Sequence, residues 1–190
     1  TQGESEGLIE SFMLAANETV ARHLFDLKKP AVYRVHEKPS PDKTETLKAM
    51  LSPLGYALRE ADNFSLQKVL EASRDKPEAP AVSTMVLRSL MKARYDTENL
   101  GHFGLAAPYY CHFTSPIRRY PDLMVHRILT ALLDGRLSGG TERRLAAAVQ
   151  KAAVQSPQRE LATQSAEREI EKRYMAEFMA GHVGETFAGT

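Results

Sequence analysis

Two adjacent arginines, Arg118 and Arg119, lie where an extended stretch of the sequence gives way to a helical one. The hydroxyl side chains of Thr114 and Ser115 precede them. A threonine or serine can cap a helical turn and leave backbone N–H groups pointing outward, which suits an anion. An arginine guanidinium adds a bidentate fork for phosphate oxygens. The segment is therefore a candidate phosphate site, and the open alternative is that the arginines pair with Asp122 or with surface carboxylates.

A second candidate pair is Glu10 and Asn17, in a stretch whose apolar residues recur every fourth position from Leu8. In a helix this spacing places both residues on one face, two turns apart. At the edge of an apolar face, a carboxylate and an amide could hold the waters of a metal ion or a sugar hydroxyl. From the residues alone the favoured interpretation is different: a capping or solvent-facing glutamate and a core asparagine satisfied by the backbone.

The third candidate, Glu167, belongs to a charged run over residues 165–173. Acids and bases in this run lie three and four residues apart, which is typical of a solvated helix face with internal ion pairs. From the residues alone, that interpretation is favoured over a special role for Glu167.

Other chemistries lack their motifs in this sequence. The six histidines and the lone cysteine, Cys111, follow no zinc pattern, and neither a Gly-rich phosphate loop nor Gly-x-Ser-x-Gly occurs. No apolar run is long enough to cross a bilayer, so no membrane partner is expected. One cysteine permits no internal disulfide, which predicts a reducing, cytoplasmic location. The net charge of +1 over 190 residues neither favours nor excludes a nucleic-acid partner.

The elements that must position these residues are mostly helical. Alternation of apolar and polar residues over 102–114 predicts two short strands separated at Pro108, and residues 31–36 are predicted as extended. The predicted fold class is α+β, predominantly α-helical, with helices packed on a short antiparallel β segment. Helical periodicity predicts helices over residues 8–25, 41–54, 64–72, 81–94, 121–135 and 141–179, the last broken or kinked at Ser156–Pro157.

Taken together, these segments resemble the ribonuclease II and ribonuclease R family of exoribonucleases. The most specific match is the run from His112 to Leu123 followed by His126–Arg127. The double arginine before Tyr-Pro-Asp favours the ribonuclease R branch of the family. Further family motifs match in the same order at residues 9–18, 33–37, 102–105 and 166–168.

The resemblance divides the chain into two parts. Residues 1–180 are similar to the C-terminal half of the family's catalytic RNB domain, so the chain is expected to be a partial catalytic domain. Residues 181–190 resemble, more weakly, the start of an S1-type RNA-binding barrel.

The resemblance implies a processive, hydrolytic exoribonuclease that degrades single-stranded RNA from the 3′ end to 5′-mononucleotides and uses Mg²⁺. It implies that Arg118 contacts the scissile or a neighbouring phosphate, and that Glu10 contacts the terminal nucleotide or its 2′-hydroxyl. The resemblance also implies a catalytic role for Glu167 near the active-site channel, where it would position or expel the product. The other residues implied to bind RNA, or to support those that do, are Asn17, Thr114, Ser115, Arg119 and Tyr120.

The sequence also departs from the family pattern. The closely spaced aspartates that hold the family's metal ions are missing, so no metal ligand is assigned in this chain, and Ser11 stands where the family commonly has a second glutamate. We therefore expect the chain to supply half an active site and to be inactive alone. Its partners would be single-stranded RNA and the missing upstream half of the domain, whose absence should leave apolar helix faces exposed.

Two interpretations from other classes stay open. The chain could be a non-catalytic RNA-binding scaffold module, which an upstream half without the aspartates would favour. It could also be a structural helical domain whose arginines form surface ion pairs. In that case the change Arg118→Ala would leave RNA affinity and its salt dependence unaltered.

Overall fold

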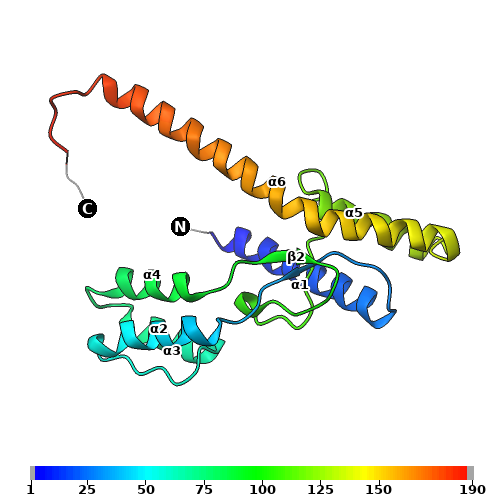
Figure 1. The fold of residues 1–190 in the computed structure, drawn as a ribbon, viewed down its shortest axis with the longest axis horizontal. Helices are drawn as coiled ribbons and strands as arrows, with labels where there is room; N and C mark the ends of the chain where they lie inside the picture. Colours follow the sequence, from blue (N-terminus) through cyan, green and yellow to red (C-terminus); the bar gives the residue numbers. More distant parts are fainter. Residues whose placement is uncertain (1–2, 188–190) are drawn as a thin grey trace.

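The computed structural model describes residues 3–187, and this part of the chain is mostly helical with one small antiparallel sheet (Figure 1). The predicted α+β class, predominantly helical, is confirmed. In chain order the elements are α1 (Glu4–Asp26), β1 (Tyr33–Val35), α2 (Pro41–Leu51), the 3₁₀ helix η1 (Ser52–Leu54), α3 (Asn63–Ser73), α4 (Ala79–Ser89), β2 (Arg94–Asp96), the 3₁₀ helix η2 (Phe103–Leu105), α5 (Tyr120–Leu133) and α6 (Gly139–Ala180).

The short central helices begin at the residues that sequence rules favour. The Lys43 N–H donates to the Ser40 hydroxyl at the start of α2, and the Ser65 N–H donates to the Asp62 carboxylate at the start of α3. Gly55 takes a φ of +81° directly after η1, a conformation in which a side chain would be strained. These local signals explain why the predicted bounds of α2 and α3 agree closely with the structure.

The sheet joins two segments that lie far apart in the sequence. β1 pairs antiparallel with β2, with Tyr33 opposite Asp96 and Val35 opposite Arg94. The prediction of a helix over residues 81–94 was wrong at its end. α4 stops at Ser89, Leu90 is extended, and Arg94 belongs to β2.

The prediction of two strands over residues 102–114 was also wrong. The segment contains η2 and isolated bridges in place of strands. It folds on itself, since the His102 N–H donates to the Ala107 carbonyl at 2.8 Å, and it meets β1 where the Arg34 N–H donates to the Tyr110 carbonyl at 2.9 Å. Position 104 requires glycine, because a Cβ there would lie 2.8 Å from Nδ1 of the buried His36 and would collide with its ring.

α6 is a single helix of 42 residues that continues through Pro157. Of the predicted break or kink at Ser156–Pro157, the break does not occur. Its first half packs on α5 and β2, while every residue from 161 to 180 is exposed. Figure 1 shows this second half extending away from the other elements. Beyond it, residues 183–187 form no strand, and the rest of the predicted barrel strand, residues 188–190, lies outside the described residues.

Two separate apolar cores hold the described residues together. The main core joins α1, the sheet, residues 109–113, α5 and the first half of α6. The second core lies among α2, α3, α4 and the loop after η1. Figure 1 shows α2, α3 and α4 as a group to one side of the main core. The candidate site residues all come from elements of the main core or from the segments that join them.

Candidate functional site

The segment from Thr114 to Asp122 is held by one buried carboxylate. The Asp122 side chain is 0% exposed and lies in the first turn of α5. Its Oδ1 accepts from the Ser115 N–H at 2.8 Å and from Arg119 Nη2 at 2.9 Å, and its Oδ2 accepts from Arg119 Nε at 2.9 Å. The ion pair considered from the sequence thus forms at Arg119, and Ser115 gives its N–H to the same carboxylate.

Arg118 is left facing solvent by this arrangement. The backbone N–H groups of Arg118 and Arg119 both point to the Ser115 carbonyl, which closes a turn before α5. The Arg118 side chain is exposed, and among the described residues it has no ion-pair or hydrogen-bond partner. Arg119 is fixed by its buried ion pair, whereas the Arg118 guanidinium has no partner in this part of the chain. Of the two, Arg118 is therefore the arginine placed to bind an external anion.

Asn17 joins α1 to the segment that leads into the junction. Its side chain is 3% exposed; its Nδ2 donates to the Tyr110 hydroxyl at 3.1 Å and its Oδ1 accepts from the Phe113 N–H at 3.0 Å. His126 of α5 holds the next backbone group, because its Nε2 lies 2.8 Å from the Phe113 carbonyl. The Asn17 amide is therefore engaged within the chain.

A cavity of about 490 Å³ lies between α1 and the junction. Glu10, Asn17, Thr114 and Arg119 all line it, so the fold brings these four candidates together. The Thr114 hydroxyl oxygen is buried and has no hydrogen-bond partner among the described residues. Such an oxygen is costly unless something outside the chain pairs with it.

A second groove, of about 850 Å³, runs between the start of α5 and the middle of α6. It is lined by Arg118 and Tyr120 from the junction and by Glu167 from α6, together with Arg119. Arg119 lines both cavities, which makes the junction their common wall. Ser115 lines neither of them.

His112 and Cys111, which lie behind the junction, are held in their neutral forms. Burial first, and then the guanidiniums of Arg119 and Arg34, lowers the pKa of His112 to about 3. The Tyr95 hydroxyl lies 2.8 Å from its Nδ1. Burial raises the pKa of the Cys111 thiol to about 12. At neutral pH both side chains are therefore uncharged, and the charges of the site come from other side chains: its arginines, its glutamates, Asp122 and Lys151.

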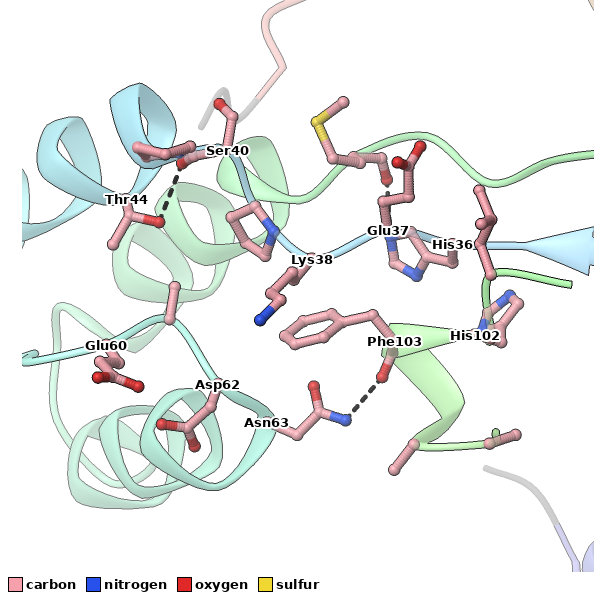
Figure 2. Close-up of a pocket in the computed structure, with 18 of the residues that line it drawn as sticks. His36, Glu37, Lys38, Ser40, Thr44, Glu60, Asp62, Asn63, His102 and Phe103 are labelled. Atoms are coloured by element: carbon pink, nitrogen blue, oxygen red, sulfur yellow. Dashed lines mark hydrogen bonds between the residues drawn. The ribbon is translucent and has the colours of Figure 1, made fainter. Parts of the chain in front are cut away.

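A larger cavity, of about 1210 Å³, lies between the second core and the sheet and is shown in Figure 2. His36 closes one side: the Gly104 N–H donates to its Nδ1 at 2.9 Å, so its Nε2 carries the proton and donates to the Met91 carbonyl at 2.7 Å. In Figure 2, Lys38 and Asp62 bring opposite charges into the same space. Carboxylates outnumber the lysines and arginine in its lining, which does not favour a polyanion.

Some residues of these cavities were not predicted from the sequence. Lys151 and Arg159 line the second groove from α6, and Arg34 reaches it from β1. Arg159 lies eight residues and Lys151 sixteen residues before Glu167. All three therefore belong to one row of residues spaced by four along α6, and this row could have drawn attention to the two cations. Arg34 gave no such signal, because its place depends on how the sheet meets α6.

Comparison with known proteins shows the family to which the chain belongs. The family model of the RNB domain matches residues 1–135. The chain belongs to the RNB domain family. It is 44% identical to ribonuclease R 1 of Lactococcus lactis and 42% identical to ribonuclease R of Aquifex aeolicus, and it covers 24% and 26% of their lengths. These alignments include 100% and 96% of this chain.

A solved structure agrees with these matches. Mycoplasma genitalium RNase R in complex with ribose-methylated single-stranded RNA superposes with a TM-score of 0.88 at 30% identity. The alignment covers 98% of this chain and 30% of that one. The chain is therefore a ribonuclease R homologue that spans about a quarter of the length of the curated relatives and covers part of the catalytic domain.

The resemblance implies Mg²⁺, an ion that takes oxygen ligands, carboxylates above all. Within residues 3–187, no group of three or more His, Cys, Asp or Glu side chains is placed to hold a metal ion. Glu10 and Glu167 line different cavities. This part of the chain does not by itself fit the ion. No helix of the described residues is long and apolar enough to cross a membrane.

Proposed function

We propose that this chain forms about half of the active site of a hydrolytic exoribonuclease that degrades single-stranded RNA from its 3′ end to 5′-mononucleotides. The observation that carries the proposal is Arg118, exposed and without a partner in the described residues, on a groove wall fixed by the buried Asp122. Arg118 would bind the scissile or neighbouring phosphate and stabilise the charge that develops during hydrolysis.

The two cavities support different parts of this role. Glu10 and the unpartnered Thr114 hydroxyl line one cavity and suit the 2′-hydroxyl of a terminal nucleotide. Glu167 lines the other and would position or expel the product. Arg119, Ser115 and Asn17 act by holding the junction, since their polar groups bind within the chain.

We propose that Mg²⁺ is held mainly by residues outside this chain and that the chain alone is inactive. The proposal rests on the lack of a fitting group of ligands in residues 3–187 and on the quarter of the relatives' length that the chain spans. We propose a cytoplasmic location, supported by the single buried cysteine. Residues 181–190 are proposed to begin an S1-type barrel.

The test joins this chain to the RNB segment that precedes the matching region in the Lactococcus lactis relative; we call this protein the completed domain. In it, Arg118→Ala should lower kcat for mononucleotide release by about 100-fold, with KM changed far less. The control is Arg144→Ala, at an exposed position of α6 outside both cavities. Equal losses in the two variants would show that Arg118 has no role in the reaction.

A further inference from the structure

The groove beside α6 has an excess of positive charge that the catalytic role of Arg118 does not use. Five cationic side chains and two carboxylates line it. Arg119 is committed to Asp122, and Arg34 to Glu160 at 3.3 Å. Among the described residues, the remaining cations have no ion-pair partner: Arg118, Lys151 and Arg159.

Two of these cations stand on the same face of α6. Lys151 and Arg159 are two turns apart, which separates them by about 12 Å along the helix axis. Gln155 and Thr163 lie on the same face and also line the groove. This face leads to Glu167 two turns beyond Arg159, so the cations precede the carboxylate along one helical stripe.

The helix that carries them is fixed in place. Ala152 and Ala153 of α6 are buried in the main core. Arg34 pairs with Glu160 on α6 and lies over the Tyr95 ring of β2 at 4.6 Å, which ties the helix to the sheet. Side chains on a fixed helix lose less entropy on binding than the same charges on a mobile loop.

We infer that the α6 face carrying Lys151 and Arg159 is a track for the phosphate backbone of single-stranded RNA. The inference deepens the proposed function and rests on it, because the track lies in the same groove as Arg118. An extended polyanion matches a row of unpaired cations that ends at a phosphate-binding arginine. Contacts to phosphates carry no sequence information, so the track holds any single strand in register.

The test measures binding of a fluorescent 2′-O-methyl oligouridylate to the 190-residue chain in EDTA, so that no hydrolysis occurs. Lys151→Gln with Arg159→Gln should weaken binding about 25-fold at about 0.1 M salt and lower the slope of log Kobs against log salt by about 1.4. A DNA strand of the same length should lose affinity by the same factor, because only phosphates are contacted.

The control carries the same charge change on the same helix. Arg143→Gln with Arg144→Gln, at exposed positions outside the groove, should leave the affinity within about twofold of the unaltered chain. Equal losses in both double variants, an unchanged salt slope, or no measurable binding by the unaltered chain at low salt would each overturn the track. So would displacement of the RNA by polyglutamate as readily as by unlabelled RNA.

The track and the proposed function can fail separately. Loss of binding in the Lys151/Arg159 variant, with no mononucleotide release by the completed domain, would keep the track and reject the nuclease. Mononucleotide release by the completed domain, with RNA affinity unchanged in the Lys151/Arg159 variant, would keep the nuclease and reject the track.

Discussion

At the scale of single residues, Asp122 determines what its neighbours can do. Its buried carboxylate accepts hydrogen bonds from Nε and Nη2 of Arg119 and from the Ser115 N–H. Of the two adjacent arginines, only Arg118 is then available to bind a ligand. Two adjacent arginines with the same side chain thus have different roles, because only one lies within reach of the carboxylate.

Replacing the carboxylate tests this division of roles. Asp122→Asn should lower the free energy of unfolding by about 3 kcal/mol, because it leaves the largely buried Arg119 charge without its partner. Urea unfolding followed by circular dichroism measures the change. Asp134→Asn is the control, since Asp134 pairs with Arg136 at the surface and should cost less than about 1 kcal/mol. A similar small cost at both positions would mean that the buried pair does not hold the junction.

The sequence predicted part of this residue-scale arrangement. It singled out Arg118 and Arg119 and left open an ion pair with Asp122, which the structure shows at Arg119. From the residues alone it favoured a core role for Asn17, and the structure shows its amide buried and bonded within the chain. The RNA-binding role that the resemblance implies for Asn17 stays a prediction. It did not predict Lys151 or Arg159, because a cation on a helix surface looks the same in sequence whether it faces solvent or a groove.

At the scale of elements, the helices were predicted where local signals mark their ends. Ser40 and Asp62 cap α2 and α3, and Gly55 follows η1. No glycine or proline marks the end of α4, so the helix was predicted to run on to Arg94, the first residue of β2. The position of β2 depends on its pairing with β1, and only the tertiary fold supplies that partner.

The alternation over residues 102–114 misled the prediction for a different reason. A two-residue period indicates a strand only when a neighbouring strand accepts its hydrogen bonds. Here the segment bonds largely to itself, and Ala106 takes a left-handed φ of +51°. Tyr110 and Cys111 are adjacent and both buried, which a regular strand packed on one face does not allow.

Pro157 lies inside α6 and allows a prediction about the stability of this helix. It has no N–H to donate to the carbonyl of Ala153, yet the helix continues through it. Pro157→Ala should restore the hydrogen bond and stabilise the chain by roughly 2 kcal/mol, measured by thermal unfolding. Pro41→Ala is the control, because Pro41 opens α2, where its ring costs no hydrogen bond and its removal should bring no gain. A loss of stability in Pro157→Ala would mean that the ring itself packs where it is needed.

At the scale of the whole molecule, α1 and α6 each expose several large apolar side chains to solvent. Leu8 and Phe12 of α1 are 57% and 63% exposed, and Tyr174 and Phe178 of α6 are 69% and 68% exposed. The sequence-based expectation that apolar helix faces would be exposed is met. Faces of this kind normally pack against another surface.

These faces predict self-association of the isolated chain. Size-exclusion chromatography with light scattering should show a mass that rises above 21.2 kDa with concentration. Tyr174→Gln with Phe178→Gln should lower that association, because it removes apolar surface from α6. Leu87→Gln, which changes a single 71%-exposed side chain on α4, should leave it unaltered. A clean monomer at every concentration would contradict the prediction.

The most direct test of the whole account measures 5′-mononucleotide release from single-stranded RNA in Mg²⁺, by this chain alone and by an equimolar mixture with the preceding RNB segment of the Lactococcus lactis relative. The account predicts no release by the chain alone and release by the mixture, because each part supplies half of the site. Release by the chain alone would contradict it and would place the whole active site, metal ligands included, within these 190 residues.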